Sequence, residues 1–399
     1  METTRTHELC KRILFSVLVL LIYLAGRSIT LYGVVTAFDD SPGNVQSIVT
    51  TMLSGDRYQR TLMSLGIMPF INASLLVQII SSLKNINSRT KISKQKQDRW
   101  MLITSVIFSV FMSVIQSLNL TLRKDAGPAS VVRLLVILEM IAGSMVTYFL
   151  CKTNEKHGIG ASMPIILLNV ITSLASNLTM YHFFRYPALI LTTAGIVVVT
   201  VFMENSIIKV PLQRVSIHNI HADQNYIAYK RNPVGIMPVM FASSFLVIIR
   251  YVILFLTYVI PSDHAFAGIL QNLLMTELPG TTLYLIIIFC LSVAFSFIML
   301  NPAESARQLQ QNGDSIIGVY AGEKTKRYLV KIVLKWSMIS GLLQAGCMSI
   351  SLILSLNHDI PTSLALIPSS GMILVSIICS LIQEIQTYYR YDAYRFSYL

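Results

Sequence analysis

The chain has 399 residues, of which 54% are apolar and only 13% are charged, and its mean hydropathy is +0.63. A soluble domain carries about 25% charged residues, so a surface this poor in charge needs a lipid environment. The composition predicts a membrane protein with several spans and excludes a soluble enzyme, a disordered chain and a disulfide scaffold. The net charge of +12 is expected in cytoplasmic loops and not on a face that binds nucleic acid.

Ten apolar stretches are long enough to cross a bilayer, which takes about 20 residues of helix. They are 13–33, 66–83, 100–120, 130–150, 159–177, 187–205, 234–259, 281–300, 329–355 and 362–384. Because their number is even, both termini are predicted on one side of the membrane. The terminal segments and the loops on their side carry 23 Lys and Arg, against eight for the other set, which predicts that the first set is cytoplasmic. The five cysteines are then expected as reduced thiols.

One segment in the loop 34–65 has the pattern of a short helix. Residues 41–55 begin with Ser41-Pro42 and end at Gly55, which are signals for the start and end of a helix. An apolar face with helical spacing consists of Val45, Ile48, Val49, Met52 and Leu53. This helix is too short to span a bilayer. It either lies on the outer leaflet or folds back into the protein from outside.

Two stretches of the chain repeat one another. Residues 66–76 and 235–245 both begin Gly-Ile-Met-Pro and are identical at six of eleven positions without a gap. They open the second and seventh spans, which run in opposite directions in the predicted topology. The chain is therefore predicted to contain two inverted halves, with its working surface at their interface. Gly66 and Gly235 would let the chain bend into each helix.

The sequence contains no convincing catalytic or metal-binding motif. There is no phosphate loop and no His-Glu-x-x-His pattern, and His218 and His221 lack a third ligand. Glu139 is the one acidic residue predicted well inside the bilayer, whereas a coupled transporter needs several intramembrane polar groups. These observations weaken a small-solute transporter and an intramembrane enzyme. They favour an apolar pathway through which a separate motor drives a substrate.

Four segments resemble the SecY family, whose members form the channel of the general protein translocase. Residues 66–74, followed by Gln78, resemble the opening of the second SecY helix. Gly158-Ile159-Gly160 is similar to the opening of the fifth, and 232–244 to that of the seventh. Residues 301–304, with the segment from Gly313 to Thr325, resemble the loop between the eighth and ninth helices.

The departures from the general pattern point to one branch of the family. The chain is short, and Val319-Tyr320-Ala321-Gly322 stands where the family has an arginine at the tip of its loop. These features resemble the accessory SecY paralogue of Gram-positive bacteria, which serves the export of large, serine-rich, glycosylated adhesins. The resemblance implies an accessory SecA-type ATPase, a SecE-type small subunit or small accessory Sec proteins, unfolded secretory polypeptide and membrane lipid as partners, with no nucleic acid and no cofactor.

The resemblance also implies the architecture. The fold would be an all-α membrane protein with ten transmembrane helices in two inverted five-helix halves. Residues 1–178 would form the N-terminal half, 179–384 the C-terminal half and 385–399 a cytoplasmic tail, in the plasma membrane with both termini in the cytoplasm. The protein itself would catalyse no reaction and hold no metal. The alternative is a polytopic secondary transporter of a small solute.

The site residues implied by the resemblance fall into four groups. An apolar pore ring would consist of Ile67, Ile71, Leu167, Ile171, Met240 and Ile373. A plug would close it from outside through the helix of residues 41–55 and the chain to Leu65. A lateral gate would run along Asn72, Ser74, Gln78, Ser243 and Ser244. The motor would dock on loops 206–232 and 301–328, through Tyr320, Arg307, Lys324, Lys326, Arg327, Arg214, Lys230 and Arg231.

Overall fold

Helices dominate the structure, as the sequence predicts. The computed structural model describes residues 5–34, 61–87, 93–120, 122–123, 127–180, 186–214, 226–242, 278–320, 322–356 and 367–395, together with Phe245, Ile249 and Leu364. The membrane-length and shorter helices are α1 (Arg5–Ser28), α3 (Met68–Asn87), α4 (Lys94–Asn119), α5 (Ala129–His157), α6 (Met163–Met180), α7 (Pro187–Asn205), α10 (Leu278–Leu300), α11 (Pro302–Gln311), α12 (Glu323–Leu356) and α14 (Ile367–Arg395). Within these ranges seven helices are long and apolar enough to cross a membrane.

The predicted spans agree with this element order. Nine of the ten coincide with a helix in the described ranges. The remaining one, 234–259, is described over its opening, where residues 237–242 are helical. Several boundaries differ: α1 begins at Arg5, α12 begins at Glu323 and α14 ends at Arg395, so these helices extend beyond the apolar stretches. We refer to the 234–259 segment as the seventh span.

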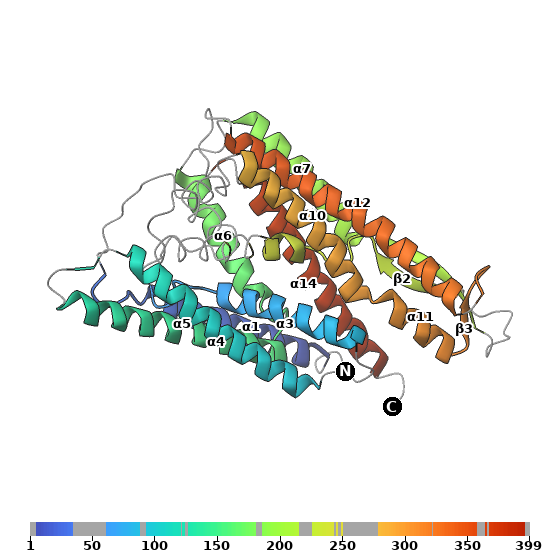
Figure 1. Ribbon diagram of the computed structural model, residues 1–399, viewed down its shortest axis with the longest axis horizontal. Helices are drawn as coiled ribbons and strands as arrows, with labels where there is room; N and C mark the ends of the chain where they lie inside the picture. The colour runs from blue at the N-terminus through green and yellow to red at the C-terminus, as the bar shows by residue number, and fades with distance from the viewer. Residues whose placement is uncertain are drawn as a thin grey trace.

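The helices form two groups (Figure 1). In one, α4 packs against α3 and α5, and α1 packs against α5 and α6. In the other, α14 packs against α7 and α12, and α12 against α10. The helix α14 also contacts α6 and α1, and so joins the two groups. A single apolar cluster contains buried residues of both groups, from Val19 of α1 to Ile377 of α14.

Small and hydroxylated residues let the helices of the first group approach closely. Ser144 of α5 donates to Ser109 Oγ of α4 at 2.7 Å, and Ser109 in turn donates to the carbonyl of Ser105 in its own helix. A Cβ atom at Gly143 would lie only 1.9 Å from the carbonyl oxygen of Leu62. Such contacts are typical of helix packing in lipid, where small residues allow close backbone approach.

Both ends of the chain lead to the same end of the molecule. Arg12 Nη1, near the start of α1, donates to the Tyr388 hydroxyl near the end of α14 at 3.4 Å, and its guanidinium lies 4.8 Å from the tyrosine ring centroid. An even number of spans requires this arrangement.

The two long loops on this side of the molecule fold together, which the sequence analysis did not predict. Strand β1 (Ile207–Arg214) pairs with β2 (Tyr226–Lys230) and, on its other edge, with β3 (Asp314–Ile316), all antiparallel. The register joins Leu212 to Ile316, over a hundred residues away. Figure 1 shows β2, β3 and α11 together at one end of the molecule. We call this unit the loop sheet.

The loop sheet has its own small core. Val210, Tyr229 and Ile316 of the strands pack with Leu309 of α11 and Leu329 of α12. Helix α11 begins at Asn301, whose side chain accepts from the Glu304 N–H, and Pro302 occupies its first turn. Burial raises the pKa of the Tyr229 phenol above its ordinary value. The loops predicted to dock a partner are thus a folded surface.

Candidate functional site

The two copies of the repeat have the same local conformation. Gly66 and Gly235 both have positive φ, +53° and +62°, a region that side-chain-bearing residues rarely adopt. In the first copy the Ile71 N–H donates to the Ile67 carbonyl at 3.1 Å, and in the second Met240 N–H donates to the Ile236 carbonyl at 3.2 Å. The predicted bend at each glycine is confirmed.

Five of the six predicted ring residues lie in or against the main apolar cluster. Ile67, Ile71, Met240 and Ile373 belong to it, and Leu167 packs on it. They come from the opening of α3, from α6, from the seventh span and from α14, so both helix groups contribute. The sixth, Ile171, is 44% exposed.

The predicted gate residues are described only on the α3 side. Asn72 is buried, and its Nδ2 lies 3.9 Å from Met112 Sδ of α4. Ser74 donates to the Ile71 carbonyl of its own helix. Within the described residues, Asn72 Oδ1 and Gln78 Oε1 are buried atoms without a hydrogen-bond partner. Ser243 and Ser244 lie outside the described residues.

The predicted plug helix also lies outside the described residues, with all five of its apolar positions, but the end of its segment is described. Residues 61–65 pack between α1 and α5. The Leu62 N–H donates to the Ile29 carbonyl at 2.8 Å, and Met63 and Leu65 join the main apolar cluster. A Cβ atom at Gly26 of α1 would lie 2.3 Å from Met63 Cε. This segment is therefore firmly packed where it enters α3.

The tip of the 301–328 loop presents an aromatic side chain to the outside. Tyr320 is 78% exposed, and Lys324 Nζ lies 4.6 Å from its ring centroid. The preceding Val319 packs on the core of the loop sheet, and Thr325 Oγ1 donates to the Tyr320 carbonyl at 2.9 Å. The backbone at the tip is held while the tyrosine ring projects.

The basic residues predicted to accompany Tyr320 differ in their environment. Those with exposed side chains are Arg307, Lys230, Lys324, Lys326 and Arg327. Arg231 is half-buried, and its guanidinium lies over the rings of Phe202 and Trp336, at 5.7 and 5.0 Å from their centroids. The side chain of Arg214 lies outside the described residues.

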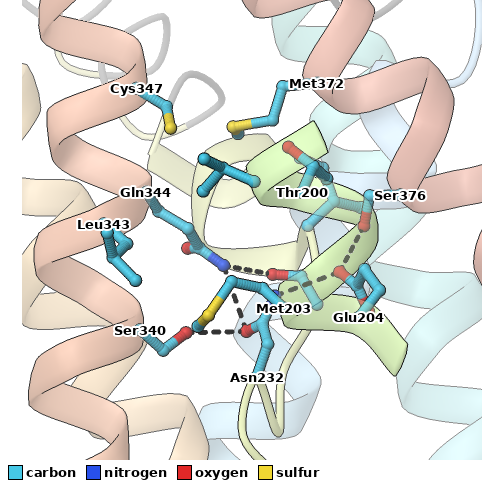
Figure 2. Close-up of a pocket in the computed structure, with 13 residues that line it drawn as sticks. Thr200, Met203, Glu204, Asn232, Ser340, Leu343, Gln344, Cys347, Met372 and Ser376 are labelled. Atoms are coloured by element: carbon cyan, nitrogen blue, oxygen red, sulfur yellow. Dashed lines mark hydrogen bonds between the residues drawn. The ribbon is translucent and has the colours of Figure 1, made fainter. Parts of the chain in front are cut away.

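A buried polar network that the sequence analysis missed surrounds the opening of the seventh span. Glu204, at the end of α7, accepts through Oε1 from Asn232 Nδ2 at 3.0 Å and from Ser376 Oγ of α14 at 2.6 Å. Asn232 Oδ1 accepts from Ser340 Oγ at 2.8 Å and Gln344 Nε2 at 3.2 Å, both on α12. Figure 2 shows these side chains converging from three helices on the turn that precedes the seventh span. We call this set the Glu204 network.

The Glu204 network borders a small cavity. Its lining includes Thr200, Met203, Cys347 and Met372 besides the network residues, and its volume is about 20 Å³. This space is comparable to that needed by one water molecule.

The opening of α6 has a polar turn of similar construction. Asn154 accepts from Ser16 Oγ at 2.9 Å and donates to the carbonyls of Ile159 and Ala161. The Gly160 N–H donates to Glu384 Oε1 of α14 at 3.1 Å. The Gly-Ile-Gly motif is thus one point at which the first helix group is joined to α14.

The structure also places Glu139 and the cysteines. Glu139 Oε2 accepts from the Tyr32 backbone N–H at 2.9 Å, which supplies the partner that the sequence could not name. All five cysteines are free thiols. No group of three or more His, Cys, Asp or Glu side chains in the described ranges could hold a metal ion, and His218 and His221 lie outside those ranges.

Comparison with known proteins defines the class. A model of the SecY family matches residues 61–382, and the chain therefore belongs to the SecY family. Among solved structures it is similar to one described as the structure of a protein conducting channel, with a TM-score of 0.66 and 17% identity over 96% of this chain and 93% of that one. It is also similar to Sec61 in the canine ribosome–channel complex, with a TM-score of 0.63 and 16% identity over the same shares of the two chains.

The curated relatives narrow the resemblance to one branch. The chain is 26% identical to the accessory Sec system protein translocase subunit SecY2 of Leuconostoc gelidum subsp. gasicomitatum, over 95% of this chain and 94% of that protein. It is 25% identical to the protein of the same name from Streptococcus gordonii, over 96% of this chain and 97% of that protein. The predicted likeness to the accessory SecY paralogue and the predicted ten-helix SecY-like fold are both confirmed.

Proposed function

We propose that this protein is the central channel subunit of an accessory Sec translocase. It would export unfolded polypeptide, such as a serine-rich glycosylated adhesin, across the bacterial plasma membrane, with both termini in the cytoplasm. An accessory SecA-type ATPase would drive the export, and a SecE-type subunit or small accessory Sec proteins would complete the complex. The likeness to proteins named SecY2 over nearly the full chain supports this proposal.

The observation that carries the proposal is the gathering of apolar ring residues from both helix groups in one cluster. Ile67, Ile71, Met240 and Ile373 are at most 9% exposed. A constriction of such side chains excludes water and ions without a charged filter, and it can widen for a polypeptide. The plug at 41–55 would close this constriction from outside, and the α3 and seventh-span openings would line the lateral gate.

The test is motor-dependent transport in reconstituted vesicles. The complex should move an unfolded adhesin only with the accessory ATPase and ATP, whereas a secondary transporter would move a solute without them. A triple variant in which Ile71, Met240 and Ile373 are each replaced by Ser should have a resting ion conductance about tenfold higher or more, because a polar constriction holds water. Ile286→Ser, at a position of α10 that is 59% exposed and outside the predicted ring, is the comparison and should change conductance much less. Normal conductance in the triple variant would refute the ring.

The motor would bind the surface of the loop sheet around Tyr320. An exposed aromatic side chain on a fixed backbone, with the Lys324 ammonium beside its ring, is suited to anchor an acidic partner surface. Tyr320→Ala should weaken binding of the accessory ATPase by about tenfold or more and lower export accordingly. Tyr389→Ala, which removes another strongly exposed tyrosine at 72%, is the control. Equal binding by both variants would exclude Tyr320 as the anchor.

A further inference from the structure

We propose that Glu384 is a positioning residue of the pore ring, which fixes the opening turn of α6 to α14 and so holds Leu167 in place relative to Ile373. The inference rests on the proposed function, in which Leu167 and Ile373 belong to the ring. Glu384 acts through the backbone of the turn and need not contact the polypeptide. Every element involved lies within the described residues.

The turn that opens α6 has an unfavourable backbone conformation. Gly160 has a φ of +77°, and the next residue, Ala161, has a φ of +46°. Glycine adopts such angles readily, whereas a residue with a Cβ atom rarely does. A conformation of this kind persists only where the surrounding structure holds it. The contacts of the turn therefore determine how α6 begins.

Buried side chains of the first helix group hold one side of the turn. Asn154 Nδ2 of α5 donates to the carbonyls of Ile159 at 3.0 Å and Ala161 at 2.7 Å. Ser16 Oγ of α1 accepts from the Ile159 N–H and donates to Asn154 Oδ1, both at 2.9 Å. Asn154 is 1% exposed and Ser16 8%, so water cannot replace these bonds. The turn is thus fixed to α1 and α5.

The other side of the turn faces α14. The Gly160 N–H donates to Glu384 Oε1 at 3.1 Å. A Cβ atom at Gly160 would lie 2.3 Å from Leu381 Cδ2, one turn before Glu384, so α14 approaches the backbone directly. A hydrogen bond to an ionised carboxylate is stronger than one to a neutral acceptor. Negative charge is also favourable here, because α6 begins at Met163 and a helix N-terminus is partly positive.

Arg12 makes a second polar link between this region and α14. Its Nη1 donates to the Gly158 carbonyl and to the Tyr388 hydroxyl, both at 3.4 Å. These distances exceed the roughly 2.7–2.9 Å that is typical of strong hydrogen bonds from a cation to a charged acceptor. The bond from Gly160 to Glu384 is therefore the stronger of the two links.

The position of the turn extends to the ring through two helices. Leu167 lies about two helical turns after Gly160, and Ile373 about three turns before Glu384. Helices bend only gently over such lengths, so the first turn of α6 determines where its later residues lie. Leu167 packs on the apolar cluster that contains Ile373. One bond near the loops thus fixes two predicted ring residues, which come from different helix groups, relative to each other.

Two glutamate variants and one control test this role in the full chain, within its reconstituted complex. E384A removes the acceptor of the Gly160 N–H. E384Q keeps an oxygen acceptor and removes the charge, so its effects should be smaller. E155A is the control, because Glu155 is an exposed glutamate at the end of α5 that accepts from Lys152 of its own helix.

Three measurements report the turn, the helix and the ring separately. The turn is followed by hydrogen exchange of the backbone at 159–163. The helix is followed by the distance between spin labels at Ile171→Cys on α6 and Ile382→Cys on α14, both exposed positions, in a chain whose native cysteines are replaced by alanine. The ring is followed by resting ion conductance.

E384A should raise exchange by about tenfold or more, because it removes a bond to a charged group. It should also lengthen the distance between the labels and raise conductance by about twofold or more, since a displaced ring residue admits water. E384Q should change each quantity in the same direction by less, and it serves alone if E384A does not fold. E155A should leave all three near the wild-type values.

The outcomes separate the anchor from the ring. If E384A changes none of the three quantities, or raises exchange while the label distance stays the same, Glu384 does not position α6 and the inference fails. If exchange and distance both change while conductance stays normal, the assignment of Leu167 to the ring is overturned, and with it that part of the proposed function. Because none of the measurements needs the motor, failure of motor-driven export would overturn the proposed function without affecting the result for Glu384.

Discussion

The two Gly-Ile-Met-Pro turns have similar backbones, but different interactions hold them in place. The turn at Gly66 follows a segment packed by shape: Met63 fills the space beside Gly26, and the Leu62 carbonyl lies against Gly143. The turn at Gly235 is held by the Glu204 network, with its short hydrogen bonds to buried polar side chains. A shared turn geometry therefore does not imply a shared means of stabilising it.

The comparison teaches which kind of substitution each half tolerates. A turn held by close packing should be sensitive to added volume, because backbone atoms cannot move aside. A turn held by buried hydrogen bonds should be sensitive to lost polarity, because each deleted partner leaves others unsatisfied. Three substitutions test this difference.

The largest effect is expected for Asn232→Leu. Leucine has a similar volume but cannot bond to Glu204, Ser340 or Gln344, so a buried carboxylate loses a donor and two buried donors lose an acceptor. Each buried group left without its partner costs about 1–3 kcal/mol, so the three together cost about 3 kcal/mol or more. The free energy of unfolding in detergent, measured by denaturant titration, should fall by that amount. A loss below about 1 kcal/mol would show that the network contributes little to stability.

An intermediate effect is expected for Gly143→Ala. The new methyl group would lie 1.9 Å from the Leu62 carbonyl oxygen, so α5 and the 61–65 segment must separate. Overpacking of this kind costs about 1–3 kcal/mol, which the same titration would measure. Gly346→Ala in α12 is the matched control, since a Cβ atom there meets nothing within 4 Å. Equal stability of the two variants would contradict close packing at Gly143.

The smallest effect is expected for Asn72→Leu, a substitution of the same kind in the helix that the other copy opens. Asn72 Oδ1 has no hydrogen-bond partner in the part of the chain that is described, and its Nδ2 faces only a thioether at 3.9 Å. Replacing a poorly paired buried amide by an apolar group of similar shape is nearly neutral or stabilising. A change within about 1 kcal/mol would support the comparison, and a loss as large as that of Asn232→Leu would break it.

The sequence predicted what depends on local pattern. Apolar stretches give the spans because a helix in lipid must be apolar over its length. The repeat predicted two bends, and positive φ at Gly66 and Gly235 confirms them. The resemblance implied that Leu167 and Ile171 both belong to the pore ring, and that assignment stays a prediction. In the structure Leu167 packs on the apolar cluster, whereas Ile171 one turn later is 44% exposed.

The Glu204 network and the loop sheet were not predicted, because both depend on residues that are far apart in the chain. Glu204 stands at the end of an apolar stretch, where a charged residue ordinarily faces water, and its partner Ser376 is 172 residues away. Strand β3 has three residues and β1 contains Pro211, so neither gives a clear strand signal. One signal could have indicated the network. It is an acidic residue within the last turn of an apolar helix, followed by a polar turn before the next span.

The pairing of β1 with β3 has a consequence for how this protein can be recombined with its relatives. Loops 206–232 and 301–328 share a ladder through Leu212 and Ile316, and they share a core through Val210 and Leu309. In a chimera that receives only one loop from another member of the family, β1 and β3 would come from different proteins, and their side chains would not be matched across the ladder. The two loops are therefore a single unit of exchange, and partner specificity should transfer between channels only when both are grafted together.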